Sequence, residues 1–179
     1  AYLLGEMEED RLWLRAPEFW AENGVELRLG QAVTAIDPTA KTVTVGGEAL
    51  AYDHLALTPG STPRRLPAAI GGSLDGVYTV RTLADVDAMR AEFQPGRRVI
   101  IVGGGYIGLE LGIAFAKMGA KVSVVEALPR ILPLYDADLT KPVAKRLSEL
   151  GVDVFTGAKA QGLDPKTGAL LFTAADGKE

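Results

Sequence analysis

A glycine-rich motif between two short apolar runs constrains the fold of this chain more than any other feature. The run Val99–Val102 consists of β-branched apolar residues and leads directly into Gly103–Gly108, which has the spacing G-x-G-x-x-G. Apolar residues at helical spacing follow in Leu109–Met118, and a second apolar run occupies Lys121–Val125. A buried strand, a tight glycine turn, a helix and a second strand form the βαβ unit that binds a dinucleotide.

The three glycines of the motif have separate physical roles. Gly103 lets the chain turn tightly out of the strand, Gly105 lets a pyrophosphate approach the backbone, and Gly108 lets the helix pack closely on the strand. The N–H groups at the start of the helix, where its dipole is positive, then face the phosphates. The alternative is a structural glycine turn without a ligand, which the agreement of all the flanking elements disfavours.

The second apolar run ends in an acidic residue, Glu126. It follows the glycines by about twenty residues, the separation at which a carboxylate accepts hydrogen bonds from the adenosine ribose. A negative charge there repels a 2′-phosphate, so the sequence favours NAD(H) over NADP(H). The alternative role is that of a structural acid at the end of a strand.

The composition excludes several other classes of protein. The net charge of −4 argues against a nucleic-acid surface, and no run approaches the length of a membrane-spanning helix. The chain has no cysteine and a single histidine, His54, so it holds neither a disulfide, a thiolate metal site nor a set of histidine ligands. An acidic, cysteine-free chain with a nucleotide motif fits the cytoplasm.

The rest of the chain predicts an α/β protein in which a Rossmann-type βαβ domain follows several short antiparallel strands. Trp13, Phe19 and Trp20 are expected to fill a small core, and the proline-rich residues 61–76 to form a linker. The sheet of the dinucleotide domain is left open by so few strands, so the chain is expected to be a fragment of a longer protein. Helices are predicted at residues 17–22, 83–93 and 137–150, and further strands at residues 25–29, 32–36, 42–45, 50–57, 77–80, 152–157 and 170–173.

Two segments carry a resemblance to a known family. Residues 52–64 contain the turn Thr58-Pro59-Gly60, and residues 103–110 contain the dinucleotide motif. With both, the chain resembles the pyridine-nucleotide–disulfide oxidoreductase superfamily, in which an NAD(P)H domain is inserted into an FAD domain. The resemblance implies a partial FAD-binding domain in residues 1–80 and an NAD(H)-binding domain, incomplete at its C-terminus, in residues 81–179. The family usually has Ala-Thr-Gly at the turn, so Pro59 removes one backbone N–H.

The resemblance also implies roles for individual residues. Glu110 is the expected catalytic residue, near the nicotinamide and the flavin; its alternative role is an acid that favours the start of a helix. Arg130 is expected on the adenosine side of the cofactor, or else as a solvated loop arginine. Gly60 and Arg64 are expected to contact FAD. The residues expected to contact the nicotinamide dinucleotide are Gly103, Gly104, Gly105, Tyr106, Ile107, Gly108 and Glu126.

The two halves of the chain resemble two different subfamilies of this superfamily. The front half, including residues 12–20 and 78–85, resembles ferredoxin reductases, in which NADH reduces FAD and FAD passes electrons to a small iron–sulfur protein. The back half, including residues 111–121 and 125–143, resembles dihydrolipoyl dehydrogenases, in which a redox cysteine pair connects a lipoyl protein to FAD. A third alternative is a truncated module that binds NAD(H) without turnover. The first is favoured, although the isolated fragment is expected to be inactive and to bind flavin poorly.

Overall fold

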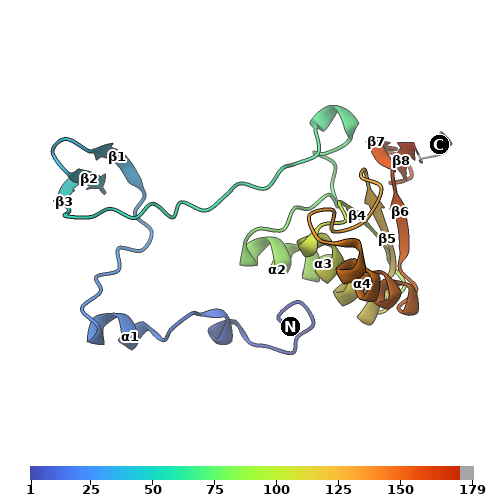
Figure 1. Ribbon diagram of the computed structural model, residues 1–179, viewed down its shortest axis with the longest axis horizontal. Helices are drawn as coiled ribbons and strands as arrows, with labels where there is room; N and C mark the ends of the chain where they lie inside the picture. The colour runs from blue at the N-terminus through green and yellow to red at the C-terminus, as the bar shows by residue number, and fades with distance from the viewer. Residues whose placement is uncertain (174–179) are drawn as a thin grey trace. The chain divides into compact units, whose positions relative to one another are not determined.

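The chain divides into two compact units, and the computed structural model describes residues 1–173. The smaller unit is Met7–Ser61, and the larger unit combines Ala1–Glu6 with Thr62–Glu179. In Figure 1 the smaller unit runs from blue to cyan and the main part of the larger unit from green to red. The boundary predicted between an FAD-binding part (residues 1–80) and an NAD(H)-binding domain (residues 81–179) does not coincide with the boundary between these compact units. That assignment of functions stays a prediction.

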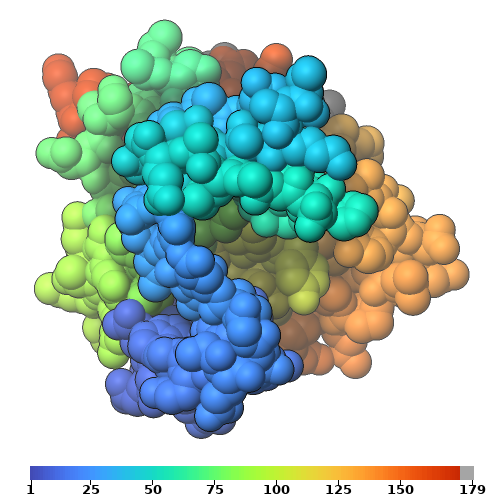
Figure 2. Space-filling model, turned by 90° about the vertical axis from the view of Figure 1, so that its left-hand side faces the viewer, coloured from blue at the N-terminus to red at the C-terminus, as the bar shows by residue number. Residues whose placement is uncertain are grey.

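The smaller unit contains two short helices and one antiparallel sheet. Its helices are η1 (Glu9–Leu12), a single 3-10 turn, and α1 (Pro17–Glu22), which has the predicted bounds and starts with proline at its first position. The sheet has the order β1 (Val33–Asp37), β2 (Thr42–Val45) and β3 (Glu48–Ala51). Figure 2 shows the surface of this unit in blue to blue-green.

Two strand predictions in the smaller unit are wrong. Residues 25–29 form no strand, because no neighbouring strand pairs with their backbone within the described residues. The side chain of Arg28 in this segment makes ion pairs with Glu26 and Glu48, both at 2.7 Å. The predicted strand at residues 50–57 ends at Ala51, since Ala51 pairs with Thr42 and β2 begins there. The backbone beyond Ala51 therefore has no ladder partner in β2.

The larger unit is built on a parallel sheet of the order β4-β5-β6. Its strands are β4 (Arg98–Val102), β5 (Lys121–Glu126) and β6 (Asp153–Thr156), connected by α3 (Tyr106–Lys117) and α4 (Ala137–Glu149). All five lie within three residues of their predicted bounds, and α4 accommodates Pro142 in its interior. The predicted α/β fold with a dinucleotide-type βαβ unit is confirmed.

Helices α3 and α4 cover one face of this parallel sheet (Figure 1). Val122 and Val124 of β5 point to that face and are 2% and 0% exposed, because alternate residues of a strand share a side. The buried cluster on this face consists of Leu3, Leu109, Phe115, Val122, Val124, Ile131, Leu147 and Val152. On the opposite face of β4, Ile100 and Val102 are 42% and 45% exposed, and the outer edge of β4 pairs with no strand within residues 1–173.

Four further elements of the larger unit lie within residues 1–173. Helix α2 (Leu83–Glu92) starts, as predicted, after Thr82, whose side chain and that of Asp85 form a capping box. A 3-10 turn, η2 (Ala68–Ile70), lies inside the predicted linker, and the predicted strand at residues 77–80 is not formed. The chain continues into an antiparallel hairpin of β7 (Lys159–Leu163) and β8 (Leu170–Thr173). The second strand was predicted with these bounds and the first was not.

Candidate dinucleotide site

The glycine-rich turn between β4 and α3 has a backbone that other residues would not allow. Gly103 has a φ of +112°, in the region that favours glycine, and its N–H donates to the carbonyl of Val125 at 2.8 Å. A Cβ atom on Gly108 would lie 2.3 Å from the carbonyl oxygen of Gly103, too close for any side chain. These two glycines therefore hold the first turn of α3 against the end of β4.

The first turn of α3 presents backbone donors to the surface. Gly105 is the N-cap residue and provides no side chain to cap the helix. The first helical hydrogen bond runs from the N–H of Leu109 to the carbonyl of Gly105 at 3.1 Å. Within residues 1–173, the N–H groups of Gly105, Tyr106 and Ile107 have no protein acceptor. Exposed N–H groups at the positive end of a helix suit a pyrophosphate, so this turn fits a dinucleotide.

Glu126 ties the end of β5 to the middle of the turn. One carboxylate oxygen accepts the N–H of Gly104 at 2.6 Å and the other accepts the N–H of Leu128 at 2.7 Å. The residue is 8% exposed, so these charge-assisted bonds compensate for the burial of its charge. A carboxylate has about four lone-pair sites, which leaves acceptor capacity for a ribose hydroxyl.

The loop between β5 and α4 lies against the same turn. The N–H of Leu132 donates to the carbonyl of Gly104 at 2.9 Å, and Ile131 is buried against Gly104. Arg130 is half-buried and donates to the carbonyl oxygens of Pro133, at 2.8 Å, and Tyr135. The guanidinium is thus bound within its own loop.

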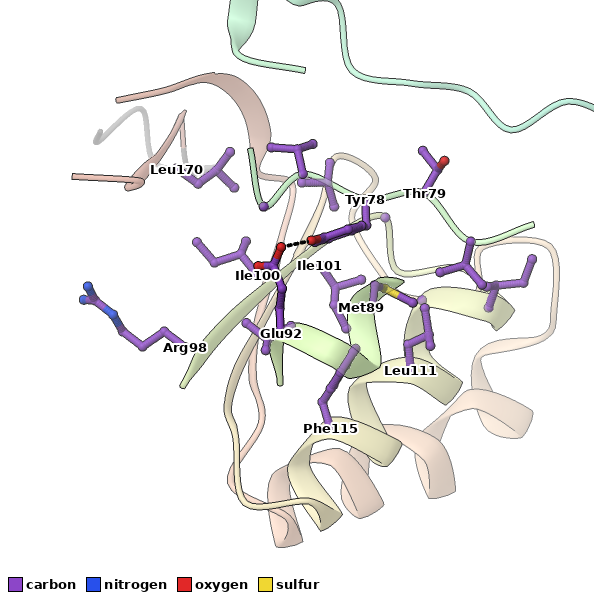
Figure 3. A pocket seen from close by; sticks show the side chains of 18 of the residues that line it. Tyr78, Thr79, Met89, Glu92, Arg98, Ile100, Ile101, Leu111, Phe115 and Leu170 are labelled. Carbon is purple, nitrogen blue, oxygen red and sulfur yellow. Dashed lines mark hydrogen bonds between the residues drawn. The ribbon is translucent and has the colours of Figure 1, made fainter. Parts of the chain in front are cut away.

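A pocket of about 940 Å³ extends from the turn along β4. Gly105, Tyr106 and Ile107 line it at the turn. Figure 3 shows Met89, Leu111 and Phe115 grouped beside Ile101, while Arg98 points away from this group. The lining is predominantly apolar, as in most small-molecule sites.

A polar pair from two elements also faces this pocket. Tyr78, in the segment before α2, donates its hydroxyl to Glu92 at the end of α2 (Figure 3). This hydrogen bond to the carboxylate raises the pKa of Tyr78 above its usual range. Arg97 donates to the main-chain carbonyl of Glu92 at 2.6 Å and closes the group. Tyr78 therefore stays a neutral hydrogen-bonding group at neutral pH.

The structure brings most of the predicted site residues together. The glycines of the turn, Tyr106, Ile107 and Glu126 form one surface, with Arg130 in the adjoining loop, and Arg64 lines the pocket. Glu110 lies on the exposed side of α3, and its side chain makes no hydrogen bond or ion pair to any residue from 1 to 173. Gly60 has a φ of +77° and belongs to the smaller unit, whereas the residues of this turn belong to the larger one.

Sequence reasoning missed the residues through which the loop holds the turn. Leu132 has a φ of +47°, a conformation that leucine rarely adopts, so no sequence signal announces it. Ile131 and Leu128 act through packing and a backbone N–H, and neither role depends on a recognisable motif. The pair of Tyr78 and Glu92 also carries no sequence signature, because it joins a segment without regular structure to a helix.

A parallel βαβ unit with a glycine turn, open helix N–H groups and an acid at the second strand defines a dinucleotide-binding protein. Residues 5–179 match the family model described as pyridine nucleotide-disulphide oxidoreductase, and the chain belongs to this family.

Curated relatives fall into the two subfamilies that the sequence suggested. The chain is 44% identical over 132 residues to a 5,5'-dehydrodivanillate O-demethylase ferredoxin reductase subunit of Sphingobium sp. (strain NBRC 103272 / SYK-6), covering 73% of this chain and 32% of that protein. It is 38% identical over 156 residues to a dihydrolipoyl dehydrogenase of Pseudomonas aeruginosa, covering 86% of this chain and 32% of that protein. The chain thus spans about a third of the length of these relatives.

Solved structures show the same fold over nearly the whole chain. A covalent putidaredoxin reductase–putidaredoxin complex matches with a TM-score of 0.84 and 33% identity, covering 99% of this chain and 44% of that one. A water-forming NADH oxidase from Lactobacillus brevis bound to NADH matches with a TM-score of 0.79 and 29% identity, covering 98% and 40%. None of the helices in residues 1–173 is both long enough and apolar enough to traverse a membrane.

Proposed function

We propose that the chain is the NAD(H)-binding part, with part of the FAD-binding domain, of an FAD-dependent NADH oxidoreductase that passes electrons to a small iron–sulfur protein. The observation that carries the proposal is the turn of Gly105–Ile107, whose open N–H groups adjoin the carboxylate of Glu126. The ferredoxin reductase names of the relatives support an iron–sulfur partner such as a ferredoxin.

The described residues divide the work of holding NADH. The N–H groups of the turn bind the pyrophosphate, and Glu126 accepts hydrogen bonds from the adenosine ribose. Glu110 lies three residues after Ile107 and four after Tyr106, so the three share one exposed face of α3. We assign Glu110 to the nicotinamide end of the dinucleotide, the role that the family resemblance implies for it. When bound, the nicotinamide and the flavin would supply the hydride chemistry, and these residues would hold and orient the nucleotide.

The flavin site is assigned to residues that match the family. Residues 1–80 are proposed as part of the FAD-binding domain and residues 81–179 as the NAD(H)-binding domain. Within the first, Gly60 has the positive φ that a close backbone turn needs, and Arg64 supplies a positive charge at the pocket. We place the protein in the cytoplasm, because the acidic, cysteine-free sequence fits that compartment.

Titration of NADH and NADPH into the chain tests the proposal directly. We expect NADH to bind and NADPH to bind more weakly, since the charge of Glu126 repels a 2′-phosphate. Glu126→Ala should weaken NADH binding about tenfold and reduce the preference for NADH, because a charged hydrogen-bond partner is lost. Asp153→Ala, an exposed acid at the start of β6, is the control. Unchanged NADH affinity in Glu126→Ala would remove this residue from the ribose site.

A dihydrolipoyl dehydrogenase is the second candidate, favoured by the relatives of that name and acting on a lipoyl protein. The two candidates differ in a redox cysteine pair, so the parent gene should be sequenced upstream of Ala1. A Cys-x-x-x-x-Cys motif there would favour the dihydrolipoyl dehydrogenase, and a flavin motif without it the ferredoxin reductase. If the gene starts at Ala1, the NAD(H)-binding module without turnover becomes the better account.

A further inference from the structure

Arg130 carries a positive charge that could bind a phosphate, but its guanidinium donates its hydrogen bonds to carbonyl groups of its own loop. The residue forms no ion pair with an acid in the part of the chain that the structure describes. One end of the guanidinium donates to the carbonyl of Pro133 at 2.8 Å and the other to the carbonyl of Tyr135. A planar guanidinium bridges two acceptors in this way because its donors form a rigid fork.

These two bonds close the loop around Leu132. The N–H of Tyr135 donates to the carbonyl of Leu132 at 3.0 Å, so the backbone from Arg130 to Tyr135 is held by three hydrogen bonds. Leu132 lies at the centre with a φ of +47°. A leucine keeps such a conformation only when its surroundings determine it.

The closed loop presents the N–H of Leu132 to the turn. That N–H donates to the carbonyl of Gly104 at 2.9 Å, while the N–H of Gly104 donates to Glu126 at 2.6 Å. Both backbone groups of Gly104 are therefore bound inside the protein. The carbonyl of Gly104 and the N–H of Gly105 belong to the same planar peptide unit, so fixing this carbonyl also fixes the first open N–H of the turn.

We propose that Arg130 is a positioning residue for the nicotinamide dinucleotide: it fixes the loop that holds Gly104, and through Gly104 it fixes the N–H groups that bind the pyrophosphate. This inference rests on the proposed function and deepens it. It assigns Arg130 an indirect role, in contrast to direct contact with the adenosine phosphates.

Two substitutions separate the indirect role from a direct one. Arg130→Lys keeps the positive charge but cannot bridge two carbonyls, whereas Arg130→Met removes both. Positioning predicts that each variant binds NADH about tenfold more weakly. Each should also speed the amide hydrogen exchange of Leu132, and neither should change the dependence of NADH affinity on salt. Arg146→Met, which removes an exposed arginine paired with Glu149, is the matched control and should leave all three readouts unchanged.

Several results would overturn the inference. Full NADH affinity in Arg130→Lys together with a loss in Arg130→Met would show that the charge itself contacts the ligand, and a reduced salt dependence in Arg130→Met would show the same. Unaltered affinity in both variants would remove Arg130 from NADH binding. If the unaltered chain binds no NADH, the proposed function fails; the exchange of Leu132 then still reports whether Arg130 holds the loop.

Discussion

Each of the two compact units contains a three-stranded sheet, but only the larger unit covers its sheet with helices of its own. In the larger unit, α3 and α4 bury Val124 and Leu147 completely. In the smaller unit, Val45 is the one buried residue within Met7–Ser61, while Leu14 and Leu29 are 83% and 81% exposed. In a βαβ sequence, the helix that connects two strands also packs on the sheet and buries one of its faces. A meander of consecutive antiparallel strands has no connecting helix, so another segment must bury its apolar face.

The largest test of this contrast is a pair of leucine truncations. Leu147→Ala, in the fully buried contact of α4 with the sheet, should lower the free energy of unfolding by about 2–5 kcal/mol because it leaves a cavity. Leu29→Ala, in the smaller unit, should change it by less than about 0.5 kcal/mol. Chemical denaturation of both variants measures the difference. Similar losses at the two positions would contradict the contrast.

A smaller effect is expected from a single methyl group at the turn. Gly108→Ala puts a Cβ against the carbonyl of Gly103, so it should destabilise the larger unit by about 1–3 kcal/mol and weaken NADH binding. Gly162→Ala, at a position with open space, is the control. Residue-resolved amide exchange should show faster exchange in β4 and α3 and no change in β1–β3. A change in β1–β3 would show that the two units do not respond independently.

The smallest effect is expected at the start of α2. Thr82→Ala removes the capping hydroxyl and should cost about 1 kcal/mol in thermal or chemical unfolding. The N–H groups of Thr82 and Arg81 and the hydroxyl of Thr82 lower the pKa of Asp85 below its usual 3.8. Since the pKa of Asp85 is lower in the folded state, its contribution to the free energy of unfolding is complete above pH 3.8 and is lost as the pH falls through the folded-state pKa.

Asp85→Asn should therefore abolish this part of the dependence of the free energy of unfolding on pH in acid.

Sequence reasoning succeeded where one segment determines its own structure. The periodicity of Val99–Val102 and Leu109–Met118 is satisfied by neighbouring residues, so β4 and α3 appear where predicted. It failed where structure depends on distant partners. The strand predicted at residues 50–57 pairs with β2 only as far as Ala51, where β2 begins. The sequence of β7 has no sustained alternation of apolar residues that would predict a strand.

The same limit applies to the site and to the small core. The glycine spacing and Glu126 were predictable because pyrophosphate binding imposes their positions, but the bonds of Arg130 and Leu132 depend on the path of a loop. Trp13 and Phe19 were expected in a core, yet they are 56% and 37% exposed. The apolar character of these side chains predicts that they are buried, but it does not say which segment packs against them. Within the smaller unit, no segment buries them fully.

The outer edge of β4 has a consequence for the behaviour of the protein in concentrated solution. Its backbone donors and acceptors have no strand partner within residues 1–173, and Ile100 and Val102 stand beside them with more than two fifths of their surface exposed. An open edge with apolar neighbours templates the addition of another strand. Arg98, at the beginning of β4, is the charge that opposes such addition. The chain should therefore self-associate increasingly as its concentration rises, and neutralising Arg98 should lower the concentration at which this begins.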